Sequence, residues 1–263
     1  MEFDTGTPDV LFEQRGAVAW LTFNRPQARN AMTFQMYDTI VRFCDAVEAA
    51  PDVRVVVLTG AGDRAFVAGT DISQFRTFTD PQHALDYEQR IDGVIGRLES
   101  LARPTIAAVH GFAVGGGASL ALACDLRICT PDSRFGVPTA RTLGNCLSMN
   151  NYARLVDLIG PARTKEMMFT ARLFTADEAA GMGLVNEIVE PERLQQRVTE
   201  VADTIAGHAP LTIQVTKEAV RRVLQFRRPP RAEELILKCY MSEDFKEGVN
   251  AFLEKRKPEW KGR

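Results

Sequence analysis

The chain has 263 residues, of which 45% are hydrophobic and 25% are charged, and its formal net charge at pH 7 is −2. This composition is ordinary for a globular protein and leaves room for one α/β domain, or for such a domain with a smaller appendage. The nearly balanced charge argues against a surface built mainly for nucleic acid or for anionic membranes.

The first part of the chain is predicted to alternate strands and helices. Val18–Phe23 is expected to be the first strand, because it is apolar and aromatic and ends at an Asn-Arg-Pro sequence. Thr33 can cap a helix whose apolar residues share one face. The run 55–59 (VVVLT) is continuously apolar, which is typical of a strand covered on both faces. Pro81 is expected to begin a second helix, whose apolar stripe indicates core packing more often than a cofactor site. That stripe consists of Ala84, Tyr87, Ile91, Val94 and Leu98.

Residues 105–125 (TIAAVHGFAVGGGASLALACD) are the stretch around which we interpret the rest of the chain. An apolar, β-prone run meets a turn made by Gly111 and by glycines 115–117, and a helix-compatible run follows at once. Consecutive glycines have no Cβ atoms to shield the backbone, so their N–H groups can approach a ligand closely. Because these donors open a helix, they lack intrahelical acceptors and lie at the positive end of its dipole. The stretch therefore predicts a site, made of backbone amides, for an oxygen that carries negative charge.

Two structural interpretations of 105–125 compete with this one. The stretch is nominally long enough to cross a bilayer, and Gly111 with Gly115 fits GxxxG, but a glycine triplet makes a poor lipid-facing helix. The second interpretation is a tight turn between a packed strand and helix, without any ligand. Neither GxGxxG nor GKS/GKT is present in this stretch, so the glycines alone do not specify a nucleotide site.

Helices dominate the second half of the prediction. Leu126–Cys129 is expected to be a short strand, and the long helix that follows the next loop is expected to stop at Gly160. Thr175 and Glu178 form the sequence pattern of a capping box, which predicts the start of a short helix. The segment 184–189 is the last expected strand.

The remaining chain is predicted to be helical, with breaks at 207–210 and at 227–231 (RRPPR). We interpret RRPPR as a solvated break rather than as a phosphate or nucleic-acid site, because interleaved aromatic residues and a basic domain are missing. The chain is accordingly divided into a core domain, 1–195, and a helical C-terminal region, 196–263.

The cysteine, histidine and N-terminal patterns are typical of a cytosolic protein with reduced thiols. The five cysteines include no CxxC pair, and the three histidines lie far apart, so we expect reduced thiols and no metal site. The first ten residues lack the basic and then apolar pattern of a secretory signal, and we expect a cytoplasmic location without a membrane partner.

Several blocks together resemble the crotonase superfamily, the enoyl-CoA hydratase/isomerase group, over essentially the whole chain. The resemblance implies an α/β crotonase (ClpP-like) fold, a spiral of ββα units with a helical C-terminal region used in trimerisation. It also implies a homotrimer or a dimer of trimers. The matching blocks are 24–26 (NRP) with 30–31 (NA), 65–72 (AFVAGTDI), 111–125, 135–138 (FGVP), 173–185 (LFTADEAAGMGLV) and 247–256 (EGVNAFLEKR).

The resemblance further implies acyl-CoA thioester substrates and an oxyanion hole made by the backbone N–H groups of Thr70 and Gly116. Reactions at the α and β carbons of a thioester pass through an enolate-like state whose charge collects on the carbonyl oxygen. Preorganised donors stabilise that state by about 3–4 kcal/mol for one good donor. By similarity, the residues that contact CoA or substrate are Ala28, Arg29, Ala31, Ala68, Asp71, Ile72 and Gly115, with Phe252 and Lys255 reaching CoA from the tail of the same or a neighbouring chain.

The sequence departs from the family at its acid/base positions. A standard hydratase of this family carries two glutamates, one three residues after the oxyanion glycine and one after the proline of the FGxP block. Here the corresponding catalytic positions are Ser119 and Thr139. An alcohol cannot act unaided as a general base, so we expect hydration to fall by orders of magnitude unless another group substitutes.

Other polar residues are candidates for the missing role. Asp71 adjoins the first predicted donor, although binding or capping explains it better. Arg141, Asn145 and Asn150 lie in a loop expected to line the acyl pocket, where they can bind a polar acyl group or orient a water, and loop or capping chemistry explains them equally well. His110 is a candidate base, but it is better interpreted as a hydrogen-bonded histidine beneath the glycine turn.

We expect an enoyl-CoA hydratase-like lyase, with coenzyme A entering as part of the substrate and no other cofactor. Decarboxylation, C–C cleavage, isomerisation and thioester hydrolysis stay open, as does a non-catalytic acyl-CoA-binding homologue. The segment 117–121 (GASLA) is one residue short of the GxSxG elbow of serine hydrolases. That elbow places its serine directly after a strand, whereas Ser119 is predicted to lie inside a helix.

Overall fold

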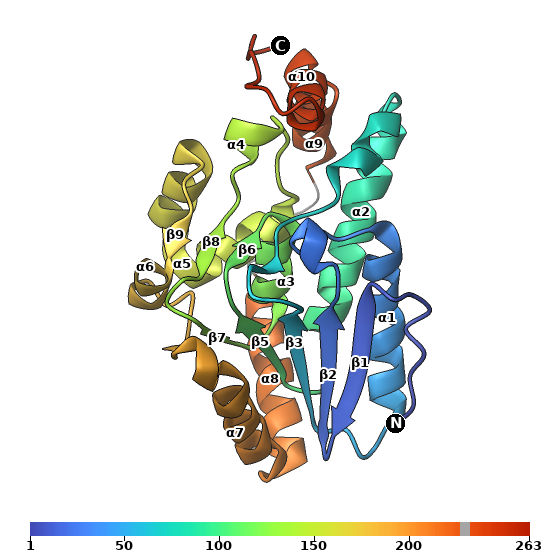
Figure 1. Ribbon diagram of the computed structural model, residues 1–263, viewed down its shortest axis with the longest axis vertical. Helices are drawn as coiled ribbons and strands as arrows, with labels where there is room; N and C mark the ends of the chain where they lie inside the picture. Colours follow the sequence, from blue (N-terminus) through green and yellow to red (C-terminus); the bar gives the residue numbers. More distant parts are fainter. Residues whose placement is uncertain (227–231) are drawn as a thin grey trace.

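The computed structural model describes residues 1–226 and 232–263, and its centre is a six-stranded sheet (Figure 1). The strand order is β1-β2-β3-β5-β7-β10; β1 and β2 are antiparallel, and the other neighbours are parallel. The bounds are β1 Val10–Arg15, β2 Val18–Phe23, β3 Val55–Gly60, β5 Thr105–Val109, β7 Leu126–Cys129 and β10 Glu187–Ile188.

The prediction of β2, β3 and β7 is confirmed, but the prediction that β2 is the first strand is wrong. β1 precedes it as an edge strand whose exposed positions are Leu11 and Glu13 and whose last three residues are polar, so it lacks the apolar run on which the prediction depended. The last strand is also shorter than expected, because only Glu187 and Ile188 pair with β7.

A second, four-stranded sheet follows the order β4-β6-β8-β9. Its members are β4 Ala65–Val67, β6 Phe112–Val114, β8 Arg134–Gly136 and β9 Phe174–Thr175. Along the chain, β3 and β4 are followed by helix α2 (Pro81–Glu99), and β5 and β6 by α3 (Gly116–Ala123). This repeated ββα succession places the ends of β4 and β6, with the loops after them, side by side.

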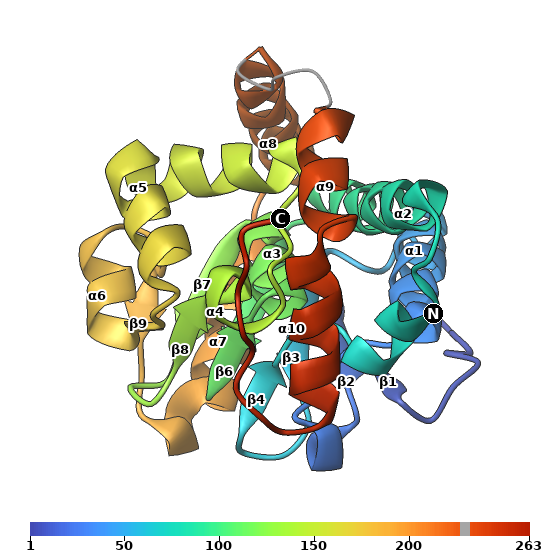
Figure 2. The same cartoon turned by 90° about the horizontal axis from the view of Figure 1, so that it is seen from above.

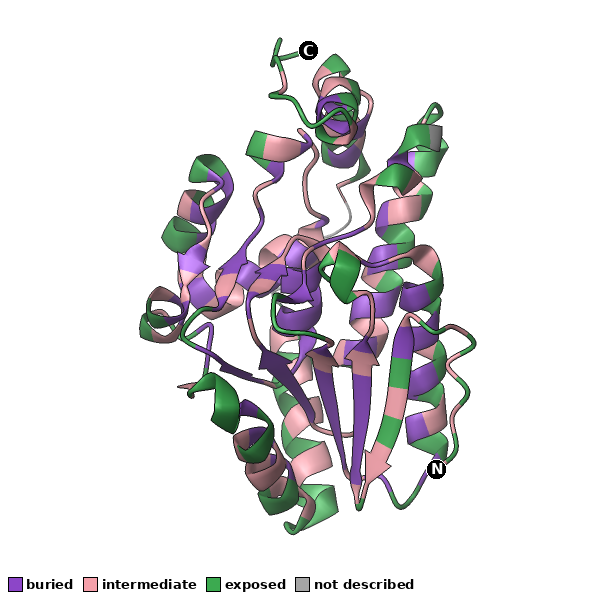
Figure 3. Cartoon of the chain, viewed as in Figure 1, coloured by how far each residue is buried: buried purple, intermediate pink, exposed green. Residues whose placement is uncertain are grey.

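Helices cover both faces of the main sheet. On one face, α1 (Phe34–Ala49), α2 and α3 enclose the larger core. On the other face, α7 (Leu194–Ala206) packs on β2, β3 and β5 through Leu194, Val198 and Ala202. β3 is therefore buried along nearly its whole length, as its uninterrupted valines predicted (Figure 3).

The predicted helix signals act where the sequence places them. Thr33 caps α1 by accepting a hydrogen bond from the Met36 amide, and Thr175 with Glu178 forms a capping box at the start of α6 (Ala176–Gly181). Gly160 has a non-helical φ of 74° and kinks α5 (Met149–Thr170), so the first helical part ends there, as predicted, and a second helical part follows from Pro161. Two 3-10 turns, η1 (Pro26–Ala28) and η3 (Pro191–Arg193), complete this part of the chain.

The C-terminal helices divide into two groups (Figure 2). α8 (Pro210–Gln225) projects from the body and has no buried residue. α9 (Glu233–Tyr240) packs on α2, and α10 (Glu243–Leu253) packs on the 3-10 turn η2 (Ile72–Thr77) and on α4 (Thr139–Thr142). The break predicted at 207–210 is confirmed between α7 and α8, whereas RRPPR at 227–231 lies outside the described residues. The boundary between 1–195 and 196–263 stays a prediction.

Within residues 1–226 and 232–263, no helix combines the length and the apolar character needed to cross a membrane. The apolar run 105–125 is divided between β5, β6 and α3.

Candidate active site

A cavity of about 490 Å³ lies where η1, the loop after β4, α2, α3 and α4 meet, and α10 contributes to its rim. Its lining contains both predicted amide positions and both substituted glutamate positions, together with most of the residues expected to contact CoA. The predicted residues in the lining are Ala28, Arg29, Ala31, Ala68, Thr70, Asp71, Ile72, Gly115, Gly116, Ser119, Thr139, Asn145 and Phe252.

Two glycine bends touch each other at this cavity. Gly69 has a φ of 110° and Gly115 a φ of 56°, conformations that favour glycine, and each directly precedes a predicted donor. A Cβ atom added to Gly115 would lie 3.7 Å from the Cα of Gly69. Because the bends are in contact, the amides of Thr70 and Gly116 belong to one small region of the cavity wall.

The backbone hydrogen bonds around the two glycine bends do not use the amides of Thr70 and Gly116. The Met32 amide donates to Gly69 O at 2.8 Å, the Asp71 amide donates to Met32 O at 2.9 Å, and the Gly115 amide donates to Gly136 O at 2.9 Å. Gly116 is the first residue of α3, where an amide has no acceptor within its own helix. Across residues 1–226 and 232–263, neither the Thr70 nor the Gly116 amide donates to another protein group.

Two tyrosines fix the side chain next to the first amide. The hydroxyl of Tyr37, from α1, lies 2.9 Å from Thr70 Oγ1, and that of Tyr87, from α2, lies 3.0 Å from the same atom. Burial raises the pKa of both phenols, to about 12 for Tyr37. Both are therefore neutral near pH 7 and act here as hydrogen-bonding groups.

A buried carboxyl group also lines the cavity. Glu88, on α2, is 5% exposed, and the Tyr240 hydroxyl from α9 donates to its Oε1 at 2.6 Å. Burial raises the pKa of Glu88 to about 7, helped by the negative charge of Asp92, while hydrogen bonds from Tyr240 and from the Ser148 backbone oppose that shift. A carboxyl group in this range can both accept and release a proton near pH 7.

The model of the enoyl-CoA hydratase/isomerase family matches residues 13–263. The chain is also 38% identical over 259 residues to a short-chain-enoyl-CoA hydratase of Clostridium acetobutylicum, covering 95% of this chain and 97% of that protein. The chain belongs to the enoyl-CoA hydratase/isomerase family, within the crotonase superfamily. A further member, the (E)-benzylidenesuccinyl-CoA hydratase of Thauera aromatica, is 35% identical over 260 residues, which are 96% of this chain and 99% of that one.

The solved structures of the family agree with the architecture. Methylmalonyl-CoA decarboxylase in complex with 2-nitronate-propionyl-CoA superposes with a TM-score of 0.87 at 29% identity, over 97% of this chain and 98% of that chain. The mixed α/β fold with its parallel sheet is thus the crotonase fold, as the sequence resemblance implied.

Ser119 and Thr139 both line the cavity, and neither side chain carries a carboxylate. Ser119 is 3% exposed and lies within α3, so it does not have the strand-to-helix position of a hydrolase nucleophile. Thr139 opens α4, and its Oγ1 is buried without a hydrogen-bond partner in the described part of the chain.

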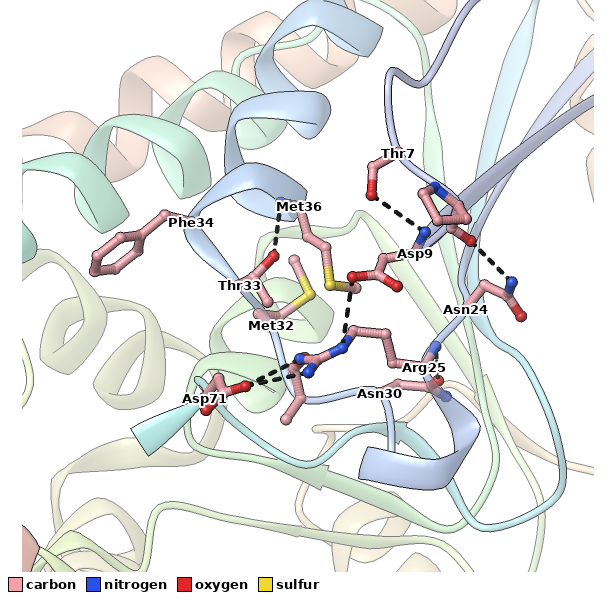
Figure 4. Close-up of polar contacts among 12 residues, drawn as sticks. Thr7, Asp9, Asn24, Arg25, Asn30, Met32, Thr33, Phe34, Met36 and Asp71 are labelled. Atoms are coloured by element: carbon pink, nitrogen blue, oxygen red, sulfur yellow. Dashed lines mark hydrogen bonds and ion pairs between the residues drawn. The ribbon is translucent and has the colours of Figure 1, made fainter. Parts of the chain in front are cut away.

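Asp71 has a structural partner. Its carboxylate lies 3.2 Å from the guanidinium of Arg25, which also approaches Asp9, and it caps η2 by accepting from the Ser73 amide (Figure 4). Partial burial tends to raise the pKa of Asp71, but hydrogen bonds from Ser73 and Arg25 outweigh it and hold that pKa below its usual value. This ionised, engaged carboxylate supports the capping interpretation.

Asn150, expected in a loop of the acyl pocket, lies instead in the first turn of α5 and outside the described lining, and its amide donates to Asp92. Arg141 and Lys255 are also outside that lining, and both are exposed on the protein surface. Their contact with CoA stays a prediction. His110, at the end of β5, is likewise outside the lining, and its Nε2 is buried without a partner among the described residues, so the expected hydrogen bond at that nitrogen is missing.

The sequence interpretation missed Glu88. A signal for it exists, because Glu88 falls four residues after Ala84 and three before Ile91, and so interrupts the apolar stripe of α2 with a carboxyl group. A charged residue on the buried face of a helix is rare unless it has a partner or a function. Its partner Tyr240 had no signal in the sequence near Glu88.

Proposed function

We propose that this protein acts on acyl-CoA thioesters and hydrates 2-enoyl-CoA, with the Thr70 and Gly116 amides binding the thioester oxygen. The observation that carries the proposal is the contact between the two glycine bends, which brings two unpaired amides to one cavity wall. Such donors stabilise the enolate-like transition state more than the ground state, and losing one lowers kcat by about 10²–10³.

The remaining predicted contacts fit a CoA ester. Ala28, Arg29 and Ala31 line the cavity on the η1 side, and Phe252 of α10 lines it on the C-terminal side. The small side chains of Ala28 and Ala31 leave room for a nucleotide or pantetheine group, and Arg29 supplies one positive charge. CoA then arrives as part of the substrate, and we propose no other cofactor.

A second reaction, decarboxylation of a carboxyacyl-CoA, is favoured by one specific observation. Both glutamate positions hold alcohols, and decarboxylation requires stabilisation of the enolate more than it requires a base. The structural similarity to methylmalonyl-CoA decarboxylase is in line with this alternative.

The test uses the purified full chain with crotonyl-CoA and, separately, with methylmalonyl-CoA. Loss of the enoyl absorbance supports hydration, and release of carbon dioxide supports decarboxylation. Turnover at background rates with both esters, and with a wider acyl-CoA panel, would reduce the proposal to a non-catalytic acyl-CoA-binding protein.

We also propose that the chain assembles as a trimer or a dimer of trimers. α8 exposes an unusual number of apolar side chains for a surface helix, and exposed patches of this kind mark interaction sites. These exposed residues are Leu211, Val215, Val220 and Val223, with Phe226 just beyond the helix.

A further inference from the structure

Glu88 supplies the cavity wall with a carboxyl group at a place other than the two substituted positions, and unlike Asp71 it is buried. Glu88 lies on the inner face of α2, one residue after Tyr87, whose hydroxyl contacts Thr70 Oγ1 at 3.0 Å. Its side chain is almost completely buried, and it lines the same cavity as the two unpaired amides. Glu88 therefore shares one cavity with the two amides that we propose to hold the thioester oxygen.

A short hydrogen-bonded chain orients this carboxyl group. Asn145 Nδ2 donates to the Tyr240 hydroxyl at 3.0 Å, and that hydroxyl donates to Glu88 Oε1 at 2.6 Å. Tyr240 is 1% exposed, so the phenol that links Asn145 to Glu88 is shielded from solvent. Because both bonds meet at one phenolic oxygen, Glu88 and Asn145 are neighbours on the cavity wall.

Two buried polar atoms in the lining of the same cavity have no partner among the described residues. Asn145 Oδ1 and Thr139 Oγ1 are both buried, and neither has a hydrogen-bond partner in the residues that the structure describes. Both residues line the cavity. An unsatisfied buried acceptor is costly, about 1–3 kcal/mol, which indicates that a water or a substrate group completes these bonds.

The groups that face Glu88 favour its protonated form at mild pH. Asp92 is the acidic neighbour one turn along α2, and Tyr37 and Tyr87 approach from α1 and α2. Tyr240 on α9, Tyr152 on α5 and Cys146 in the loop before α5 surround the other sides. These neighbours are acidic or neutral, so the proton affinity of Glu88 is set by burial and repulsion.

We propose that Glu88 is the proton-transferring residue of this site and that Asn145 Oδ1 holds the second hydrogen of the attacking water. The inference rests on the proposed hydration of 2-enoyl-CoA. The Glu88 carboxylate takes one proton from water as the water oxygen bonds to Cβ, and the electron pair of the Cα=Cβ bond moves through Cα to the thioester oxygen. The Glu88 carboxylic acid then returns a proton to Cα, which restores the carbonyl and the carboxylate and adds one water overall.

The other polar groups of the site are poorer candidates for this role. Ser119 and Thr139 carry alcohols, which do not ionise near neutral pH. Asp71 is held as an anion by Arg25, and His110 does not line the cavity. Glu88 combines access to the cavity with a proton affinity suited to both halves of the reaction.

The test compares Glu88→Gln with a matched control, Asp86→Asn, which makes the same carboxyl-to-amide change at an exposed position of α2 outside the cavity. We expect kcat for crotonyl-CoA hydration to fall by about 10²–10⁴ in Glu88→Gln and to stay within twofold in Asp86→Asn. The red shift of a bound 2,4-dienoyl-CoA, which reports polarisation of the thioester carbonyl, should persist in both variants.

Tyr240→Phe supplies a second readout, because the tyrosine positions Glu88 without touching the substrate. The wild-type protein should lose kcat/KM as the pH falls below about 7, where Glu88 becomes protonated. The Tyr240 hydrogen bond holds the pKa of Glu88 down. Tyr240→Phe should therefore move the acidic limb of the pH profile of kcat/KM to higher pH. Glu88→Gln should have no such limb.

The outcomes separate the inference from the proposed function. If Glu88→Gln keeps kcat within threefold while the wild-type protein hydrates crotonyl-CoA, the role of Glu88 is wrong and the proposed function stands. If Glu88→Gln also loses the dienoyl-CoA shift, the pH limb of Tyr240→Phe decides, and an unmoved limb overturns the inference. A wild-type protein that binds the dienoyl ester but does not hydrate crotonyl-CoA overturns the hydration step and the proposed hydratase function together.

Discussion

The hydroxyl of Tyr37 occupies the place that a side chain at Gly116 would need. A Cβ atom built on Gly116 would lie 2.3 Å from that hydroxyl and 3.2 Å from Thr70 Oγ1. Since the Tyr37 hydroxyl also bonds Thr70, one phenol limits both residues whose amides we assign to the oxyanion hole.

Gly116→Ala should therefore disturb the site through Tyr37. We expect kcat to fall by about 10²-fold or more and the free energy of unfolding to fall by about 1–3 kcal/mol, because the overlap has to be relieved by movement. Tyr37→Phe removes the overlapping oxygen, while the ring carbon that carried it is 3.7 Å from the added Cβ. The stability loss in the double variant should be smaller than the sum of the single losses. Additive urea-unfolding energies would contradict this account.

The burial of Glu88 makes a prediction about stability as well as activity. Its pKa is raised to about 7 in the folded protein from an ordinary value of 4.5, so the folded state binds more protons than the unfolded state between these values. The stabilisation associated with the protonated form is present below pH 4.5 and is lost as the pH rises through 7. Urea unfolding at pH 5 and pH 8 should show this loss, at most about 3 kcal/mol, in the wild-type protein and not in Glu88→Gln. Equal pH dependence in the two proteins would show that Glu88 does not titrate in this range.

The ion pair between Arg25 and Asp71 should control the shape of the predicted CoA entrance. Arg25 also donates to Ala31 O at 2.7 Å, so it joins the loop after β2 to the start of η2 (Figure 4). Arg25→Met should raise KM for acyl-CoA several-fold with little change in kcat, because the loop loosens while the glycine bends stay in place. Arg25→Lys keeps the charge and serves as the control. Steady-state kinetics that show a fall in kcat alone would contradict the assignment.

The apolar face of α8 should support assembly. Val215→Glu combined with Val223→Glu places two charges on that face and should convert a trimer or larger assembly to monomers, as measured by sedimentation velocity. The control is Gln89→Glu with Gln196→Glu, which adds the same charge at exposed polar positions on α2 and α7 and should leave the assembly intact. Unchanged sedimentation of the valine variant would place the interface elsewhere.

Local signals in the sequence predicted most of the fold. The all-apolar β3, the Thr33 cap and the Thr175–Glu178 capping box each depend on residues within a few positions of one another. β1 escaped prediction because an edge strand needs only one apolar face. Its second half, residues 13–15 (EQR), is polar and resembles a loop.

The sequence interpretation assigned residues to the candidate site only where the family blocks describe them. Thr70 and Gly116 lie in glycine-rich blocks that can be recognised, and the structure places them at one cavity. Glu88 depends instead on Tyr240, which is 152 residues away in the chain, and no local pattern encodes such a contact. The burial that changes its proton affinity likewise depends on distant segments, among them α9, which packs on α2.

The packing of α9 on α2 also has a consequence for synthesis on the ribosome. The strands and helices up to α7 can emerge and pair while the partner of Glu88 is still untranslated. Glu88 gains its hydrogen-bond donor only after residue 240 has left the exit tunnel, so a nascent chain folded up to α7 carries this carboxyl group without Tyr240 and without the cover of α9.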